Sequence, residues 1–439
     1  MPSRRTEIDS LNVGDLCQDG GVTIEYRSPI GFTEAARLDN IGFGGGPESS
    51  ERVEIYRSLF EPARSIGAYD GDELVGQTGG WTLRMRVPAR SVEQAAAFGS
   101  SASLPTLGTL GVGPVVVSPT HRRRGIMSQL LRRQFAGLHD AGAEPVTALT
   151  ASEPAIYGRF GYGLATEQAS LAVPRTHSML RPVTGMDERE VRFADPAGSV
   201  ELVRRLQNAA TAGNPGSFEH DERWIARQLQ DPPSDRGGGS EVRLVVCLAG
   251  DEPTGYAVYQ TRHTESGGRT DVRKVLALDL ASYARLWRFL FDIDLMTTTT
   301  HHHLGTDDPL LSLLVDSRRA AVTVRDGLWV RIVDIDRALA GRTYSTDFTA
   351  VLEVLDADCP WNGGRWRLSG SRDGASCEST TDRADLTVHV RELGAAFLGR
   401  PVLSSCARAG FVEEHSKGAV ATVSAAFAHD PTPWADTVF

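Results

Sequence analysis

The order of apolar and polar residues predicts strands and helices over most of the chain. Residues 22–66 mix short strand and helix signals around a glycine-rich break at Gly44–Pro47. The stretch SIGAYDGDELVGQTGGWTLRMRV (65–87) predicts two strands joined by a turn at 70–72, because a short Asp-Gly turn between apolar runs is typical of a hairpin. We expect the Ser-, Gly- and Ala-rich stretch 98–106 to be a loop.

The next segment predicts a crossover of strand, loop, helix and strand. LGTLGVGPVVVS (107–118) has a nearly continuous apolar end, which is typical of a central strand covered on both faces. A helix is expected over 125–139 with Gly142 as its stop, and PVTALTAS (145–152) predicts another short strand. Such a crossover should be right-handed. The apolar residues of the helix share one face: Ile126, Leu130, Leu131, Phe135 and Leu138.

The second half of the chain repeats this mixture after a boundary that we place near 180–192. Its pattern predicts helices at 199–212, 219–230 and 281–293 and strands at 242–249, 254–262 and 270–280. The last part, 336–439, opens with a helical IDRALAGR and continues with the strand patterns VLEVLD, RWRLSG and DLTVHV. It closes with helical patterns at 391–399 and 421–428, so we interpret it as a small α+β domain.

The length of 439 residues predicts two to four domains, because single cores stop growing near roughly 250–300 residues. The five cysteines are scattered without a CxxC pair, so neither a disulfide framework nor a zinc site is expected, and a cytoplasmic location fits best. No apolar run approaches the ~20 residues of a membrane span. We expect residues 1–21, which lack the apolar core of a secretory signal, to form a flexible tail.

The net charge of −10 argues against a general nucleic-acid binder, which would carry a basic patch. It is compatible with a cationic acceptor such as a polyamine, and equally with a charge that only keeps the protein in solution. The run His301-His302-His303 is the one metal-like feature. Adjacent residues point in different directions and rarely converge on one ion, so we predict no metal.

The most informative chemistry lies in VVVSPTHRRRGIMSQLLRRQF (115–135), where a strand enters a basic loop and a helix leaves it. A helix N-terminus presents unpaired N–H groups and partial positive charge, so a pyrophosphate can bind there. The arginines of 122–124 add cationic donors, and Gly125 lets the backbone come close to phosphates. Val115 and Val117 would offer backbone groups to an extended amide arm such as that of pantetheine. The alternative is a solvated surface turn.

The pattern V-x-V-x-P-x-x-R-R-R-G-I resembles the acetyl-CoA loop of the GNAT superfamily. Two longer strings, PTHRRRGIM … LTASEPAIYGRFGYGLAT and DPLLSLLVDSRRAAVTVRDGLWVRIVDIDRAL, resemble the Eis (enhanced intracellular survival) family of actinobacterial aminoglycoside N-acetyltransferases. The resemblance spans nearly the whole chain after about residue 22 and includes the terminal Phe439. The longer strings are far more specific than the loop pattern alone.

The resemblance implies an α/β (α+β) fold of tandem GNAT-like domains followed by a sterol-carrier-protein-like α+β domain. The implied boundaries are 22–185 for the catalytic GNAT domain and 186–335 for a second, degenerate GNAT-like domain. Residues 336–439 would form the sterol-carrier-protein-like domain, which supplies the C-terminal carboxylate. Relatives assemble as hexamers, so a homo-oligomer is expected from the resemblance alone.

The resemblance also implies acetyl-CoA as co-substrate. Tyr157, the first tyrosine of IYGRFGYG, matches the general acid that protonates the departing CoA thiolate, and Tyr162 is the rival for that role. The α-carboxylate of Phe439 matches the base that takes a proton from the attacking amine. Tyr56 and Arg57 correspond to a wall of the acceptor pocket. The residues implied to hold CoA are Val115, Val116, Val117, Arg122, Arg123, Arg124, Gly125 and Ile126, with Ser152 beside the arm.

Three departures from the family pattern concern the acceptor half. Pro114 stands where relatives can carry an aromatic residue, Pro154 replaces a glycine, and Val438 stands where an acidic residue can precede the last phenylalanine. The expected activity is therefore N-acetylation of a primary amine on a cationic acceptor such as an aminoglycoside, without a stated regiospecificity. Two alternatives stay open: a protein-lysine N-acetyltransferase, and a lipid- or sterol-carrier-like binding protein with a vestigial GNAT domain.

Overall fold

Two long strands divide their residues between the two units of the chain. A computed structural model describes residues 18–19, 22–45, 49–89, 103–265 and 267–437. The first unit comprises 1–82 and 110–142, and the second unit comprises 83–109 and 143–439. The division falls inside β4 (Glu73–Arg86) and β5 (Thr106–Val117), so each strand contributes to both units. Most of the expected tail over 1–21 and much of the expected loop over 98–106 lie outside the described residues.

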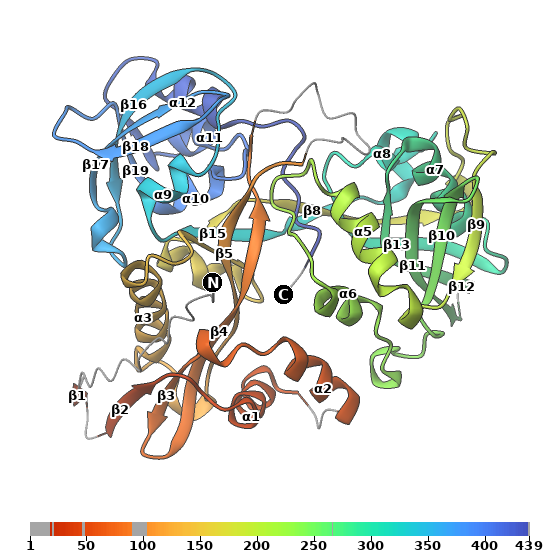
Figure 1. The fold of residues 1–439 in the computed structure, drawn as a ribbon, viewed down its shortest axis with the longest axis horizontal. Helices are drawn as coiled ribbons and strands as arrows, with labels where there is room; N and C mark the ends of the chain where they lie inside the picture. The colour runs from red at the N-terminus through yellow and green to blue at the C-terminus, as the bar shows by residue number, and fades with distance from the viewer. Residues whose placement is uncertain (1–17, 20–21, 46–48, 90–102, 266, 438–439) are drawn as a thin grey trace, which may run out of the picture. The chain divides into compact units, whose positions relative to one another are not determined.

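The first unit contains strands in the order β1-β2-β3-β4-β5, antiparallel from β1 to β4 (Figure 1). Asp70 pairs with Glu73, which confirms the predicted hairpin turn. The predicted helix over 125–139 is confirmed as α3, and its apolar face is buried as expected. The remaining elements are β1 (Gln18–Asp19), β2 (Val22–Arg27), β3 (Ile66–Asp70), α1 (Phe32–Phe43), α2 (Ser50–Leu59) and α3 (Ile126–Asp140).

The second unit begins with a strand arrangement that sequence patterns did not predict. Strand β15 (Leu328–Ile332) lies between β6 (Val146–Thr150) and β7 (Gly163–Leu164), antiparallel to both. The short helix α4 (Pro154–Tyr157) connects β6 to β7. A strand from far along the chain thus fixes both ends of the segment that carries Ser152 and Tyr157.

A seven-stranded sheet of order β14-β8-β13-β12-β11-β10-β9 forms the middle of the second unit. Its strands are β8 (Glu167–Pro174), β9 (Glu190–Ala194), β10 (Arg243–Ala249), β11 (Glu252–Thr264), β12 (Gly267–Ala277), β13 (Met296–Leu304) and β14 (Thr323–Asp326). The accompanying helices are α5 (Val200–Ala210), α6 (Glu222–Leu229), α7 (Leu280–Phe291) and α8 (Pro309–Leu313). The helices expected at 199–212, 219–230 and 281–293 are present. The strand expected over 270–280 ends at Ala277, because Asp279 caps α7 instead.

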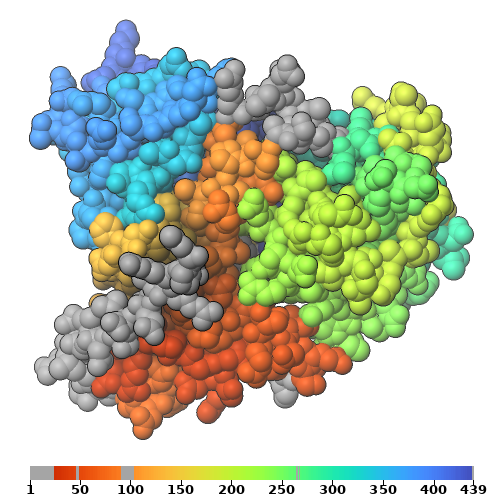
Figure 2. All heavy atoms as spheres, viewed as in Figure 1, coloured from red at the N-terminus to blue at the C-terminus, as the bar shows by residue number. Residues whose placement is uncertain are grey.

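Alternating residues of β11 face two different cores. Tyr256 and Val258 pack with α5 and α6, whereas Ala257 and Tyr259 pack with α7 on the other face of the sheet. The outward side chains of α5 and α6 form part of the surface seen in yellow-green in Figure 2. The sheet is therefore covered on both faces.

The C-terminal part is an α+β arrangement, as predicted, with a five-stranded sheet of order β18-β17-β16-β19-β20. Its strands are β16 (Phe348–Leu355), β17 (Gly364–Gly370), β18 (Ala375–Ser379), β19 (Leu386–His389) and β20 (Val412–Glu414). Its helices are α9 (Ile335–Ala340), α10 (Val390–Ala396), α11 (Leu403–Arg408) and α12 (Ala419–Phe427). Helix α10 also packs on β7 and β15, so closely that a Cβ on Gly163 would collide with the helix backbone.

A buried ion pair holds β15 to the C-terminal part. The Arg331 guanidinium donates two hydrogen bonds of 2.8 Å to the Asp356 carboxylate, and both side chains are almost fully buried. The same carboxylate also accepts from the side chain of Asn362. Breaking such a pair from one side leaves an uncompensated charge in a region of low dielectric, which costs much more than the pair gains.

We expect Asp356→Ala to lower the free energy of unfolding by about 3–5 kcal/mol, because Arg331 would remain buried without its partner. The matched control is Asp382→Ala, which removes an exposed ion pair with Arg367 and should cost at most about 1 kcal/mol. Denaturant titration followed by circular dichroism measures both values. Equal losses in the two variants would contradict the assigned role of the buried pair.

Candidate functional site

Apolar packing in the first unit fixes the strand end that precedes the basic loop. Val116 is buried, and Val115 and Val117 are partly buried. Val117 packs on a small core that also holds the first turns of α3, formed by Ala68, Val75, Ile126 and Leu130. The strand end and the helix start therefore share one core, which sets the ends of the loop 118–125.

A chain of polar contacts braces the loop itself. The Ser118 N–H donates to the Val75 carbonyl at 2.8 Å, and the Ser118 hydroxyl shares a hydrogen bond of 2.9 Å with Thr120. The Thr120 hydroxyl contacts His121 Nδ1 at 2.8 Å, and His121 Nε2 lies 3.1 Å from the Asp70 carboxylate at the end of β3. These residues were not predicted, because only the fold brings the 70–72 turn to the loop.

The loop presents its charges outward. Arg122, Arg123 and Arg124 are all exposed, and Arg122 reaches the Gly42 carbonyl with a hydrogen bond of 3.3 Å. Arg123 has a φ of 65° and Gly125 a φ of 76°, so two positions of this short loop adopt the left-handed region. A non-glycine residue in that region is strained, and such strain is found more often at binding sites than elsewhere.

The N-terminus of α3 is built to accept an anion. Its N-cap residue is Gly125, which provides no side-chain cap, and Gln129 is the first residue whose N–H bonds back to the Gly125 carbonyl. The N–H groups of the first turn therefore have no intrahelical acceptor, and they carry the positive end of the helix dipole. Together with three exposed guanidinium groups they form a site of the kind that binds pyrophosphate.

Tyr157 lies in the second unit at the end of α4. Only 8% of its surface is exposed, and its ring meets Tyr162 edge-on at 5.8 Å. Among the described residues its hydroxyl has no hydrogen-bond partner. Burial raises the pKa of the Tyr157 phenol, and the Glu153 carboxylate raises it further. The group therefore stays protonated well above neutral pH and keeps a proton to donate.

Tyr162 is placed differently from Tyr157. It is completely buried, and its hydroxyl accepts a hydrogen bond of 2.8 Å from Thr147 on β6. Burial raises the pKa of the Tyr162 phenol far above its usual range. The structure therefore favours Tyr157 over Tyr162 as a group that exchanges a proton with a substrate.

The residues around Tyr157 explain one departure from the family pattern. Ser152 and Glu153 are exposed in the turn after β6, and Pro154 begins α4. Proline suits the first position of a helix, where its missing N–H would have no partner in any case. Pro154 is therefore compatible with the turn.

Tyr56 and Arg57 lie side by side in sequence on α2 but have different surroundings. Tyr56 is 37% exposed, and Arg52 donates to its hydroxyl at 3.1 Å. The Arg57 guanidinium lies 4.3 Å from the centre of the Phe32 ring and 3.4 Å from Glu54. Both side chains thus contact neighbours, and both remain exposed.

Several expectations concern other parts of the chain. Val438 and Phe439 lie outside the described residues. The three histidines lie on β13, where His301 Nδ1 accepts the His303 N–H at 3.0 Å and burial lowers the pKa of both rings, that of His303 to about 4. In the described ranges no three His, Cys, Asp or Glu side chains are grouped to hold a metal. Nor does any helix there have the length and apolarity needed to cross a bilayer.

Comparison with known proteins places this geometry in a family. Residues 28–165 and 216–332 each match the description "Acetyltransferase (GNAT) domain", and residues 335–436 match "Sterol carrier protein domain". An uncharacterized N-acetyltransferase of Streptomyces coelicolor is 42% identical over 400 residues, covering 89% of this chain and 93% of the relative. N-acetyltransferase Eis of Mycobacterium tuberculosis is 31% identical over 399 residues, covering 88% and 91%.

A solved structure points to the same family. Eis1 from Mycobacterium abscessus has a TM-score of 0.78 and 30% identity, with 94% of this chain and 100% of that chain covered. The chain belongs to the Eis family of GNAT acetyltransferases. The expected fold of two GNAT domains and a sterol-carrier-protein domain is thereby confirmed, and so is the expected enzyme class. GNAT domains use acetyl-CoA, which fits the loop and helix N-terminus described above.

Two glycines at opposite ends of α3 allow a matched test of the loop in this Eis-family protein. Gly125 and Gly142 both have positive φ, and a Cβ added to either would meet no atom within 4 Å. We expect Gly125→Ala and Gly142→Ala to cost similar stability, about 1–2 kcal/mol each. Only Gly125→Ala should raise the KM for acetyl-CoA, by about tenfold, which corresponds to about 1.4 kcal/mol.

Steady-state kinetics and thermal melts of both variants check this expectation. The Gly142→Ala protein controls for the strain of an alanine in the left-handed region. An unchanged KM for acetyl-CoA in Gly125→Ala would remove the loop from the cofactor site.

Proposed function

We propose that this Eis-family enzyme transfers the acetyl group of acetyl-CoA to a primary amine of a cationic acceptor, of which aminoglycosides are the first candidates. The observation that carries the proposal is the intact donor loop, with exposed arginines before an uncapped helix N-terminus. A domain that had lost its donor would have no reason to keep a strained, cationic loop. The residues assigned to CoA are Val115, Val116, Val117, Arg122, Arg123, Arg124, Gly125, Ile126 and Ser152.

The reaction needs one proton donor and one proton acceptor. The neutral amine attacks the thioester carbon, the new C–N bond forms, and the C–S bond breaks to release CoA as a thiolate. In our proposal the Tyr157 phenol gives its proton to that sulfur, because its hydroxyl is not committed to a described partner and burial keeps it protonated. The α-carboxylate of Phe439 takes the proton that the amine nitrogen loses.

The proposed acceptor follows from the net charge of the chain and from its membership of the Eis family. The net charge of −10 is compatible with a cationic acceptor, whose arrival long-range attraction can speed. In the proposed acceptor pocket Tyr56 and Arg57 both contribute exposed side chains. A lysine side chain of a protein would undergo the same chemistry and is the second candidate. A homo-oligomer, expected to be a hexamer, stays a prediction.

Purified protein should release CoA thiol when it is mixed with acetyl-CoA and a panel of aminoglycosides. The rate should rise with pH until the acceptor amine is deprotonated, because only the neutral amine attacks. Thiol release measured with a chromogenic reagent, together with the mass of the product, checks this expectation. Release with lysine peptides and none with aminoglycosides would select the second candidate, and no release with any amine would reject the proposal.

The two tyrosines provide a matched pair for the proton donor. Tyr157→Phe should lower kcat by about 10²–10⁴-fold with little change in the KM for acetyl-CoA, because a general acid usually contributes that much. Tyr162→Phe removes a hydroxyl that is bonded to Thr147, so it should cost about 1 kcal/mol of stability and leave kcat nearly unchanged. The opposite pattern in kcat would transfer the acid role to Tyr162.

A further inference from the structure

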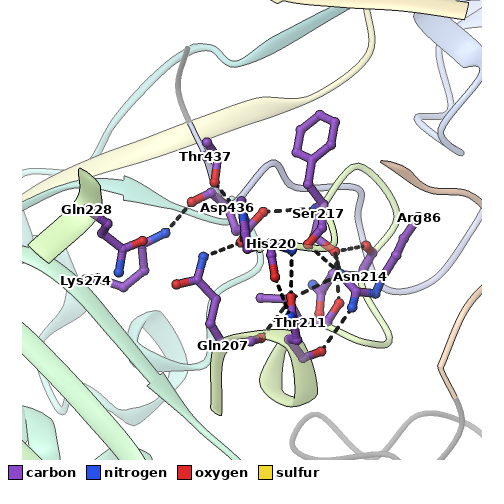
Figure 3. Close-up of polar contacts among 12 residues, drawn as sticks. Arg86, Gln207, Thr211, Asn214, Ser217, His220, Gln228, Lys274, Asp436 and Thr437 are labelled. Atoms are coloured by element: carbon purple, nitrogen blue, oxygen red, sulfur yellow. Dashed lines mark hydrogen bonds and ion pairs between the residues drawn. The ribbon is translucent and has the colours of Figure 1, made fainter. Parts of the chain in front are cut away.

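The last described residues of the chain are held by a buried carboxylate. Asp436 is 4% exposed, although it lies three residues from the chain end. Its carboxylate accepts hydrogen bonds from the Gln207 side chain at 2.8 Å and from the Phe218 N–H at 3.1 Å. His220 Nε2 lies 2.8 Å from the same carboxylate (Figure 3). A single buried carboxylate with so many partners needs an explanation.

The backbone of the same segment is held as well. The Lys274 ammonium group donates to the Asp436 carbonyl, and the Thr437 hydroxyl shares a hydrogen bond of 2.9 Å with His220. The Trp434 N–H donates to the Pro215 carbonyl at 2.9 Å. The segment is therefore fixed in position and in register, which one apolar side chain could not achieve.

The partners of Asp436 belong to three segments of the second unit. Gln207 lies on α5, Lys274 on β12, and Phe218 and His220 lie in the segment before α6. This segment is joined to the end of β4, because the buried Arg86 side chain donates to the Phe218 carbonyl at 2.8 Å and to the Asn208 carbonyl at 3.1 Å. Figure 3 shows Gln207, His220 and Lys274 around Asp436.

The electrostatics of the cluster keep Asp436 ionised. Burial alone would raise the pKa of this carboxyl, but His220, Lys274 and Gln207 together hold it well below its usual range. A buried charge of this kind is rarely the cheapest source of stability, since apolar residues of similar size often serve as well or better. A requirement for a defined position of the chain is the better explanation.

The chain geometry links this anchor to the proposed base. Each residue spans at most about 3.3–3.6 Å, so the three residues that follow Asp436 can extend the chain by at most about 10–11 Å. We propose that Asp436 is a positioning residue that fixes the point from which the terminal carboxylate reaches the acceptor amine. This inference rests on the proposed function, in which that carboxylate is the base.

The direct test compares Asp436→Asn with Asp430→Asn, a control that removes an exposed carboxylate from the same C-terminal segment. Asp436→Asn should lower kcat about 10²-fold, the usual effect of misplacing a reacting group by about 1 Å, with the KM for acetyl-CoA unchanged. Asp430→Asn should behave as the parent enzyme. An unchanged kcat in a folded Asp436→Asn protein would overturn the proposal.

A chain extended by two glycines after Phe439 separates positioning from general stability. The extension moves the terminal carboxylate and should itself lower kcat. If Asp436 acts through that group, Asp436→Asn should lower kcat little further in the extended chain, since coupled changes are not additive. An equal additional loss in the extended chain would show a purely structural role and overturn the inference.

The same experiment distinguishes failure of the inference from failure of the proposed function. A parent enzyme whose kcat does not respond to the extension would remove the terminal carboxylate as the base. An enzyme that responds to the extension but not to Asp436→Asn keeps its base and loses only the proposed anchor.

Lys274→Met covers the case in which Asp436→Asn fails to fold. It keeps the hydrogen bonds of the Asp436 carboxylate to Gln207, Phe218 and His220. It removes the donor to the Asp436 carbonyl together with one of the positive charges that keep the carboxyl ionised. We expect a smaller loss of kcat, about tenfold, in the same direction and with the same KM for acetyl-CoA. A folded Lys274→Met enzyme with full kcat would count against the anchor, and melting curves establish that each variant is folded.

Discussion

The pairing of β15 with β6 and β7 is the constraint on which the rest of the second unit depends. It joins a strand from the end of the second GNAT domain to the strand that precedes Tyr157, and Arg331 then ties it to Asp356 in the sterol-carrier-protein part. Helix α10 packs on the same strands, with its Arg391 side chain against the Gly158 backbone beside Tyr157. The turn that carries the proposed acid is thus supported by residues from the far end of the chain, and the three domains are not independent modules.

The two GNAT domains differ at the one position where a phosphate would bind. In each, a helix follows a central strand, but α3 starts at an uncapped glycine behind three arginines, whereas α7 starts at Asp279. The Asp279 carboxylate accepts from the Ser282 N–H at 2.8 Å and is paired with Arg189. The Asp279 carboxylate therefore occupies the N-terminus of α7 and supplies the negative charge that a pyrophosphate would otherwise provide there. The second GNAT domain therefore lacks the uncapped, cationic helix start of the first, and its Gln207 and Lys274 side chains instead hold Asp436.

Sequence patterns predicted the features that interactions between neighbouring residues determine. The hairpin around 70–72, the buried face of α3 and the helices of the second half follow from periodicity and turn chemistry, which act over a few residues. The position of β15, the contact between His121 and Asp70 and the anchoring of Asp436 depend on which distant segments meet, and no periodicity carries that information. The donor loop was predictable because strand, loop and helix are consecutive. The role of the terminal carboxylate as a base was predicted only through the family resemblance.

In the proposed mechanism, the Asp436 side chain and the terminal carboxylate need opposite properties. An anchor must remain ionised, so a pKa held far below neutrality by buried donors suits Asp436 and makes it a poor proton acceptor. A base must accept a proton during each turnover, so its pKa must not be lowered by a similar set of hydrogen-bond donors. If one residue carried both tasks, every donor that improved the anchor would weaken the base. The proposed mechanism divides the two tasks between the Asp436 side chain and the terminal carboxylate, which removes this conflict. Other enzymes likewise use environments that push the pKa values of neighbouring carboxyl groups apart.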